Sequence, residues 1–249
     1  MPRYFIYLSY DGSNYHGWQV QPNAPTVQEK LESALSLLMR TPISVTGAGR
    51  TDTGVNASTM VAHADFSEEI DCKQIAYRLN KILPPDIAIH YIRRVKDSAH
   101  ARFDATSRRY RYYVSTAKNP FNRRYSCRLT GEIDFDAMNE AAAVLPEYTD
   151  FTSFSKLHTD TKTNNCKIAY ARWSRLSADE WVFEIEADRF LRNMVRAIVG
   201  TLLMIGRGKI AKEQIREIIE KKLRSEAGDS APAQALFLEE VKYPEDLFL

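Results

Sequence analysis

Cysteine is scarce in this 249-residue sequence, which contains only Cys72, Cys127 and Cys166. Three widely separated cysteines without a CxxC pair do not form the spacing of a zinc site or a redox centre, and they favour free thiols in a reducing cytoplasm. The five histidines are also scattered, with neither metal-ligand spacing nor a neighbouring nucleophile. We therefore expect no metal and assign no histidine to catalysis.

Long apolar runs are also lacking. The most apolar stretch, residues 190–205, is interrupted by Arg192, Asn193 and Arg196, so it does not have the pattern of a membrane span. The N-terminus has no apolar core of the kind found in signal peptides. These features predict a cytoplasmic protein without a membrane segment.

The chain has almost no excess of charge of either sign. Its 34 Lys and Arg residues against 32 Asp and Glu give a formal net charge of +2, which does not by itself indicate a polyanionic partner. Local clustering is more informative, because residues 93–111 contain seven basic and two acidic side chains. A nucleic-acid interface would have to rest on such clusters.

Hydrophobic periodicity predicts the same order of elements in both halves of the chain. Thr26 and Glu29 form a capping box, Asp71 can cap a second helix, and Pro84 with Pro85 must end that helix. In the first half we expect strand 4–10, helix 26–39, strands 43–46 and 59–66, a helix after 71, and strand 87–95. In the second half we expect strand 106–116, helix 135–145, strands 167–176 and 181–187, helices 190–205 and 212–223, and strand 235–243.

This repeated βαββαβ order predicts an α/β fold of two ferredoxin-like halves, in residues 1–104 and 105–249. Each half would contribute to a mainly antiparallel sheet with its helices on one face. The other face and a central cleft between the halves would then be available to a ligand.

The densest local signal is the glycine-flanked segment 47–55, GAGRTDTGV. A dinucleotide fingerprint would need glycine where Asp52 stands, and a phosphate loop would need lysine where Val55 stands. What remains is a loop that holds Asp52 close to Arg50, with glycines that let a ligand approach the backbone. The pattern is compatible with a catalytic carboxylate and equally with an Asx-turn in a long hairpin.

Arginine and tyrosine alternate in residues 108–113. In a strand, Arg109 and Arg111 would face one way and Tyr110 and Tyr112 the other. Interleaved cations and aromatic rings suit phosphate contacts beside base stacking, as in proteins that hold unstacked RNA. A solvated charged face opposite a tyrosine-rich core explains the pattern equally well.

The apolar helix predicted from Phe190 carries Arg192 and Arg196 one turn apart, beside Gly200. Like charges at that spacing are mildly destabilising, so a nearby anion would be a natural partner. Exposure of this strip to solvent is the alternative.

Taken in order, these motifs resemble the tRNA pseudouridine synthase A family over nearly the whole chain. The similarity is carried by YDGSNYHGWQ at 10–19, TVQE at 26–29, GAGRTDTGVNA at 47–57, RYRY at 109–112, DFTSFS at 150–155 and FLRNMVRAIVG at 190–200. The family commonly has histidine where Asn56 stands, which puts an essential imidazole at that position in doubt.

The resemblance implies the pseudouridine synthase fold and isomerisation of uridine to pseudouridine at positions 38, 39 and 40 of the tRNA anticodon stem-loop. It implies a homodimer that needs no cofactor and no metal. Asp52 corresponds to the catalytic aspartate, Tyr110 to the tyrosine that stacks on the substrate, and Arg196 to the basic partner of the aspartate. We also assign Arg50, Arg109 and Leu191 to substrate binding.

Two other classes of protein have to be compared with this interpretation. A non-catalytic RNA-binding module of ferredoxin-like architecture would explain the Arg and Tyr strand but not the glycine-flanked Asp52. A glycoside-cleaving enzyme would need a second carboxylate as acid, and none is evident close to Asp52 in the sequence.

Overall fold

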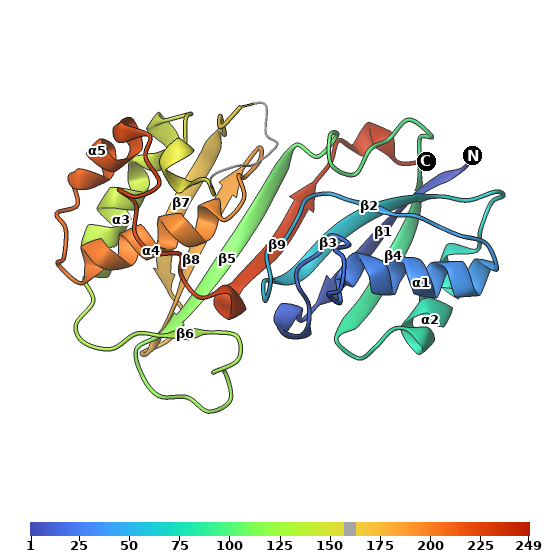
Figure 1. Cartoon of the computed structure of the whole chain (residues 1–249), viewed down its shortest axis with the longest axis horizontal. Helices are drawn as coiled ribbons and strands as arrows, with labels where there is room; N and C mark the ends of the chain where they lie inside the picture. The colour runs from blue at the N-terminus through green and yellow to red at the C-terminus, as the bar shows by residue number, and fades with distance from the viewer. Residues whose placement is uncertain (157–162) are drawn as a thin grey trace. The chain divides into compact units, whose positions relative to one another are not determined.

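A computed structural model of the chain describes residues 1–156 and 163–249 (Figure 1). The chain forms two compact units. Unit 1 contains Met1–Ser107 and Phe237–Leu249, and unit 2 contains Arg108–Leu236. The boundary lies close to the predicted one, but the last strand, which the sequence analysis placed in the second half, belongs to unit 1.

Unit 1 has the predicted βαββαβ order. Its elements are β1 (Arg3–Tyr10), the short 3-10 helix η1 (Gly12–Asn14), α1 (Val27–Met39), β2 (Thr46–Gly47), β3 (Asn56–Asp65), α2 (Cys72–Ile82) and β4 (Ile87–Val95). The sheet order is β4-β1-β3-β9, with β2 on β3. The β1–β3, β1–β4 and β2–β3 pairs are antiparallel.

The C-terminal strand β9 (Leu236–Lys242) completes the sheet of unit 1. It runs parallel to β3, with Asn56 opposite Phe237 and Ala57 opposite Leu238. This pairing joins residues about 180 positions apart in the sequence, which explains why local periodicity found the strand but not its partner. After β9, the 3-10 helix η5 (Glu245–Leu247) follows.

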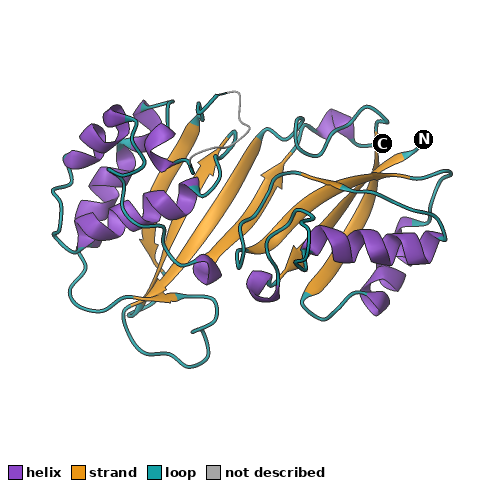
Figure 2. Ribbon diagram, in the orientation of Figure 1, coloured by secondary structure: helices purple, strands orange, loops and turns teal. Residues whose placement is uncertain are grey.

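Unit 2 contains mainly antiparallel strands and three α-helices (Figure 2). Its strands are β5 (Ser107–Ser115), β7 (Ile168–Arg175) and β8 (Glu180–Ala187), in the order β5-β8-β7, and the short β6 (Cys127–Arg128) runs parallel to β5. The helices are α3 (Phe135–Ala143), α4 (Met194–Gly206) and α5 (Gln214–Lys221), with short 3-10 turns η2 (Leu145–Glu147), η3 (Thr152–Phe154) and η4 (Ala233–Ala235).

Two helix starts form as the sequence predicts. Thr26 accepts a hydrogen bond from the backbone N–H of Glu29, and Asp71 accepts from Lys73 and Gln74, so each cap satisfies amides of the first turn. Figure 2 shows α1 and α2 running beside the sheet of unit 1.

Two predicted elements were wrong in their extent. The strand expected at 43–46 is reduced to β2, because the amide of Ile43 donates to Ser36 Oγ and that of Val45 donates to Glu32 Oε1. The helix expected from Phe190 begins instead at Met194, because Asn193 adopts a left-handed conformation with φ 67°. Asparagine is among the few residues that tolerate this region.

No helix in residues 1–156 or 163–249 combines the length and the apolar character that crossing a membrane requires.

His63, near the end of β3, makes the stability of unit 1 depend on pH. The side chain is 7% exposed, and its Nδ1 accepts a hydrogen bond of 3.1 Å from the backbone of Ala101. Burial, reinforced by the positive charge of Arg3, lowers the pKa of His63 from 6.5 to about 4. The folded state therefore favours the neutral ring, and its contribution is complete above pH 6.5 and is lost as the pH falls towards 4.

We expect protonation of His63 to remove about 3 kcal/mol from the free energy of unfolding between pH 7 and pH 4. Urea denaturation at both pH values, on the wild type and on His63→Asn, measures this contribution. Asparagine retains an acceptor but cannot titrate, so the variant should lose less stability than the wild type over this range. An equal loss in both proteins would show that His63 does not contribute.

Candidate active site

Asp52 lies on the loop between β2 and β3, where it is half-buried, while Arg50 of the same loop is exposed. The backbone carbonyl of Asp52 accepts a hydrogen bond of 3.1 Å from the N–H of Val55 and closes the turn. The main chain therefore closes this turn.

The Asp52 loop is held by the segment that follows β1. Tyr10 Oη and Thr51 Oγ1 lie 2.8 Å apart in a buried hydrogen bond. The N–H of Trp18 donates to the carbonyl of Thr51 at 3.3 Å, and the N–H of Gly54 donates to the carbonyl of Tyr15 at 3.3 Å. Residues on both sides of Asp52 are therefore fixed to residues 10–18, and we call this segment the brace.

Two glycines allow the brace to approach the loop closely. A Cβ atom at Gly17 would overlap the carbonyl oxygen of Thr51, and Gly17 also has φ 88°. A Cβ atom at Gly12 would overlap the carbonyl oxygen of Val55. By contrast, a Cβ atom at Gly49, inside the loop, would have no heavy atom of the described residues within 4 Å. Gly47, at the start of the loop, is also required by packing, because a Cβ atom there would overlap the indole ring of Trp18 in the brace.

Asn56, which stands where the resembled family has histidine, also supports the brace. Its side chain is 2% exposed, and its Oδ1 accepts a hydrogen bond of 2.8 Å from the N–H of Gly12. The polar side chain at this position therefore joins the start of β3 to η1.

In unit 2, Tyr110 lies on β5 and is half-buried. Its ring packs edge-on against Phe190, with ring centroids 5.1 Å apart and planes at 88°. Leu191, next in sequence, is 4% exposed. This contact joins β5 to the segment that precedes α4.

Arg109 faces the opposite side of β5, as strand alternation predicts, and there it takes part in a cluster around Glu184. Arg111 Nε donates to Glu184 at 2.8 Å, and Arg109 Nη1 and Arg172 Nη2 lie 3.6 and 3.4 Å from its carboxylate. Burial alone would raise the pKa of Glu184, but hydrogen bonds from Arg111 and Tyr170 and the arginine charges outweigh it and hold the pKa below its ordinary value. Three guanidinium groups around one carboxylate leave this face with an excess of positive charge.

Arg196, in the first turn of α4, is fixed by the segment 227–231. Its Nε donates to the carbonyl of Ala231 at 2.7 Å, and the N–H of Ala231 donates back to the carbonyl of Arg196 at 3.0 Å. The N–H of Gly228 also donates to Thr201 Oγ1. Because α4 begins at Met194, Arg192 precedes the helix, and the expectation that it lies one helical turn from Arg196 was wrong.

Gly200 allows the segment 227–231 to pack against α4. A Cβ atom at Gly200 would overlap the carbonyl oxygen of Asp229. We expect Gly200→Ala to displace this segment and to cost about 1–3 kcal/mol of unfolding free energy, although alanine is the better helix former.

Thermal and urea denaturation measure this cost. Gly208→Ala is the matched control, since a Cβ there meets no atom within 4 Å and only its φ of 66° is strained. A Gly200→Ala protein more stable than the wild type would contradict the packing.

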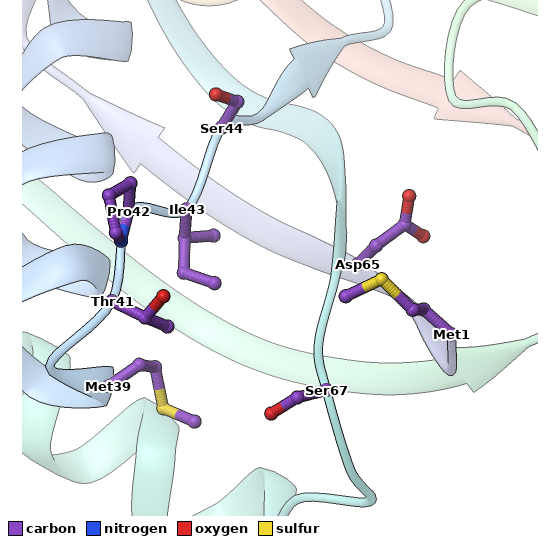
Figure 3. Close-up of a pocket in the computed structure, with 8 residues that line it drawn as sticks. All are labelled: Met1, Met39, Thr41, Pro42, Ile43, Ser44, Asp65 and Ser67. Atoms are coloured by element: carbon purple, nitrogen blue, oxygen red, sulfur yellow. The ribbon is translucent and has the colours of Figure 1, made fainter.

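The cavity in Figure 3 lies elsewhere in unit 1. Its volume is about 450 Å³, and it is lined by residues of the connection between α1 and β2 together with Met1, Asp65 and Ser67. The Asp65 carboxylate within it already accepts two hydrogen bonds from Arg3, at 2.7 and 2.8 Å. Neither Arg50 nor Asp52 lines this cavity, so it is separate from the candidate site.

Metal-ligating side chains do not cluster in the described part of the chain, where no group of three or more His, Cys, Asp or Glu side chains could hold a metal ion. The cysteines Cys72, Cys127 and Cys166 are free thiols.

The α/β fold agrees with comparisons to known proteins. The sequence model of a family described as tRNA pseudouridine synthase matches residues 6–104 and 148–244. The chain therefore belongs to the tRNA pseudouridine synthase family, as its motifs indicate.

Relatives that match the chain over its whole length carry the name tRNA pseudouridine synthase A. The protein of that name from Bacteroides thetaiotaomicron is 60% identical over 250 residues, which cover 100% of this chain and 93% of the relative. The one from Parabacteroides distasonis is 59% identical and covers 100% and 98% of the two chains. The one from Thermoanaerobacter sp. strain X514 is 39% identical and covers 98% and 100%.

Proposed function

We propose that this protein isomerises uridine to pseudouridine at positions 38, 39 and 40 of the tRNA anticodon stem-loop, with Asp52 as its catalytic carboxylate. We further propose that it acts as a homodimer in the cytoplasm, without a cofactor or a metal. The observation that carries the proposal is a half-buried aspartate on a braced loop, in a chain whose family match extends over parts of both units.

The proposed reaction needs no redox agent. The bond between ribose C1′ and uracil N1 breaks, the base turns, and C1′ bonds to C5, which loses its hydrogen as a proton while N1 gains one. A carboxylate can assist by attacking the sugar or by removing a proton, and both routes are compatible with Asp52. The Asp52 loop would hold the carboxylate at a fixed position, and a catalytic group has to be held in the correct position relative to the reacting atoms.

In this proposal, substrate binding is assigned to Arg50, Tyr110, Leu191, Arg196 and Arg109. The target base has to leave the helical stack, and an aromatic ring such as Tyr110 can then stack on it. The guanidinium group of Arg50 suits phosphate oxygens, and Arg196 corresponds to the basic partner of the catalytic aspartate in the family that the chain resembles. Arg109 could add to the positive potential of its face while it remains paired with Glu184.

Mapping of the modified nucleotide tests the proposal. After incubation with the protein and treatment with a carbodiimide, an unmodified tRNA transcript with uridines at positions 38, 39 and 40 should carry alkali-stable carbodiimide adducts there. A transcript with cytidine at these positions should acquire none. Absence of pseudouridine from the first transcript, or its formation only at other positions, would refute the proposed function.

Tyr110 provides a separate prediction about base stacking. We expect Tyr110→Phe to keep most of the tRNA affinity and Tyr110→Ala to lose about 1–3 kcal/mol of binding free energy, as measured by filter binding. Tyr77→Ala is the control, because Tyr77 is an exposed tyrosine on α2 outside the candidate site. Full affinity and activity in Tyr110→Ala would remove Tyr110 from the site.

A further inference from the structure

The loop between β5 and β6, residues 116–126, is the most unusual surface of unit 2. Figure 1 shows it extending away from the strands of that unit. It contains Lys118, Arg123 and Arg124 and no acidic residue, whereas the rest of the chain holds 31 basic and 32 acidic side chains. All three cationic residues are exposed.

An aromatic ring is exposed among these cations. Phe121 is 93% exposed, the highest value among the large apolar side chains of the described residues, and Tyr125 is 39% exposed. Burial of this exposed phenylalanine ring against a partner would be favourable, because it would remove apolar surface from water.

Hydrogen bonds within the loop and to β8 hold Phe121 in place. Asn119 Oδ1 accepts from the N–H of Phe121 at 2.9 Å, and the N–H of Tyr125 donates to the carbonyl of Asn122 at 2.9 Å. The side chain of Asn122 also donates to Glu180 Oε1 on β8 at 2.5 Å. A loop that is already ordered loses less conformational entropy when it binds.

An RNA strand fits this combination better than a protein surface does. An unpaired base offers a flat face to an aromatic ring, and its flanking phosphates offer negative charge to nearby cations. Protein interfaces, in contrast, are depleted in charged residues at their centres.

We propose that the β5–β6 loop is an additional RNA-binding element, in which Phe121 stacks on an unpaired base and Lys118, Arg123 and Arg124 contact the adjacent phosphates. This inference rests on the proposed function, because tRNA is the RNA that the loop would hold. The loop lies outside the motifs through which the chain resembles its family and outside the residues 6–104 and 148–244 that match the family.

Binding of a fluorescein-labelled, unmodified tRNA transcript to the full-length protein tests the stacking. Phe121→Ala should weaken binding about 5- to 100-fold in fluorescence anisotropy, and Phe121→Trp should restore it. Leu37→Ala should bind as the wild type does, because Leu37 is a 68% exposed apolar side chain on α1 of unit 1 and is not part of the loop. Unchanged affinity in Phe121→Ala would overturn the proposal.

Salt dependence tests the phosphate contacts. Replacing Lys118, Arg123 and Arg124 together with glutamine should reduce the slope of log affinity against log salt concentration by about 2 to 3. An unchanged slope would overturn the proposal. So would normal tRNA binding by Phe121→Ala together with a changed oligomeric state in analytical ultracentrifugation, since the loop would then contact protein.

Failure of this inference can be distinguished from failure of the proposed function. If the wild type forms pseudouridine and Phe121→Ala has the same tRNA affinity and KM, the loop proposal fails while the function stands. If the wild type forms no pseudouridine but Phe121→Ala weakens tRNA binding as expected, the loop proposal stands and the function fails.

Discussion

Replacing Asp52 with asparagine should reduce pseudouridine formation by at least about 10³-fold while tRNA binding stays close to that of the wild type. Asparagine keeps the shape of the side chain but can neither attack the sugar nor accept a proton as a carboxylate does. The turn itself should survive, because its hydrogen bond uses the backbone carbonyl of Asp52. Single-turnover assays of pseudouridine formation and filter binding on the same protein separate the two effects.

Asp71→Asn is the matched control for this substitution. Asp71 is an aspartate of unit 1 that caps α2, and asparagine caps helices about as well. This control should keep both stability and activity. An Asp52→Asn protein with activity like that of Asp71→Asn would assign Asp52 a purely structural role.

Gly17→Ala is expected to reduce activity strongly although residue 17 carries no reactive group. An added Cβ would overlap the carbonyl oxygen of Thr51, directly before Asp52, so either the loop or the brace must shift. Displacements of about 1 Å at a catalytic group can cost about 10²-fold in rate. The rate constant for pseudouridine formation at saturating tRNA should fall by about that factor.

Gly131→Ala separates backbone strain from the overlap. Gly131 has φ 83°, close to the 88° of Gly17, but a Cβ there meets no atom within 4 Å. Both variants should lose about 1 kcal/mol of stability from strain, whereas only Gly17→Ala should lose activity. Equal rates in the two variants would show that the brace does not position Asp52.

Local sequence signals predicted much of the fold. The caps at Thr26 and Asp71 formed as expected, and alternation placed Arg109 and Tyr110 on opposite faces of β5. The start of α4 was missed because the pattern of apolar residues continues back to Phe190, while the left-handed backbone of Asn193 interrupts the helix. The strand at 43–46 was overpredicted because two of its backbone amides donate hydrogen bonds to side chains of α1.

Long-range partners could not be predicted from local patterns. The pairing of β9 with β3 and the position of Glu184 beside Arg109 and Arg111 depend on contacts between distant segments. In the candidate site, the sequence drew attention to the glycines around Asp52, but Gly12 and Gly17 of the brace are also in close contact with the loop. The only sequence signal for these two glycines was their presence in the motif at 10–19. The physical reason for glycine at these positions became apparent only from the packing.

Release of tritium from C5 of uridine reports the proposed isomerisation most directly, because bonding of C5 to ribose displaces the hydrogen that C5 carries. With tRNA transcripts labelled at this atom, the wild type should release tritium from the uridines at positions 38, 39 and 40. Asp52→Asn should release none while it still binds the transcript. Release by Asp52→Asn at the wild-type rate, or no release by a wild-type protein that binds the transcript, would contradict catalysis of this reaction by Asp52.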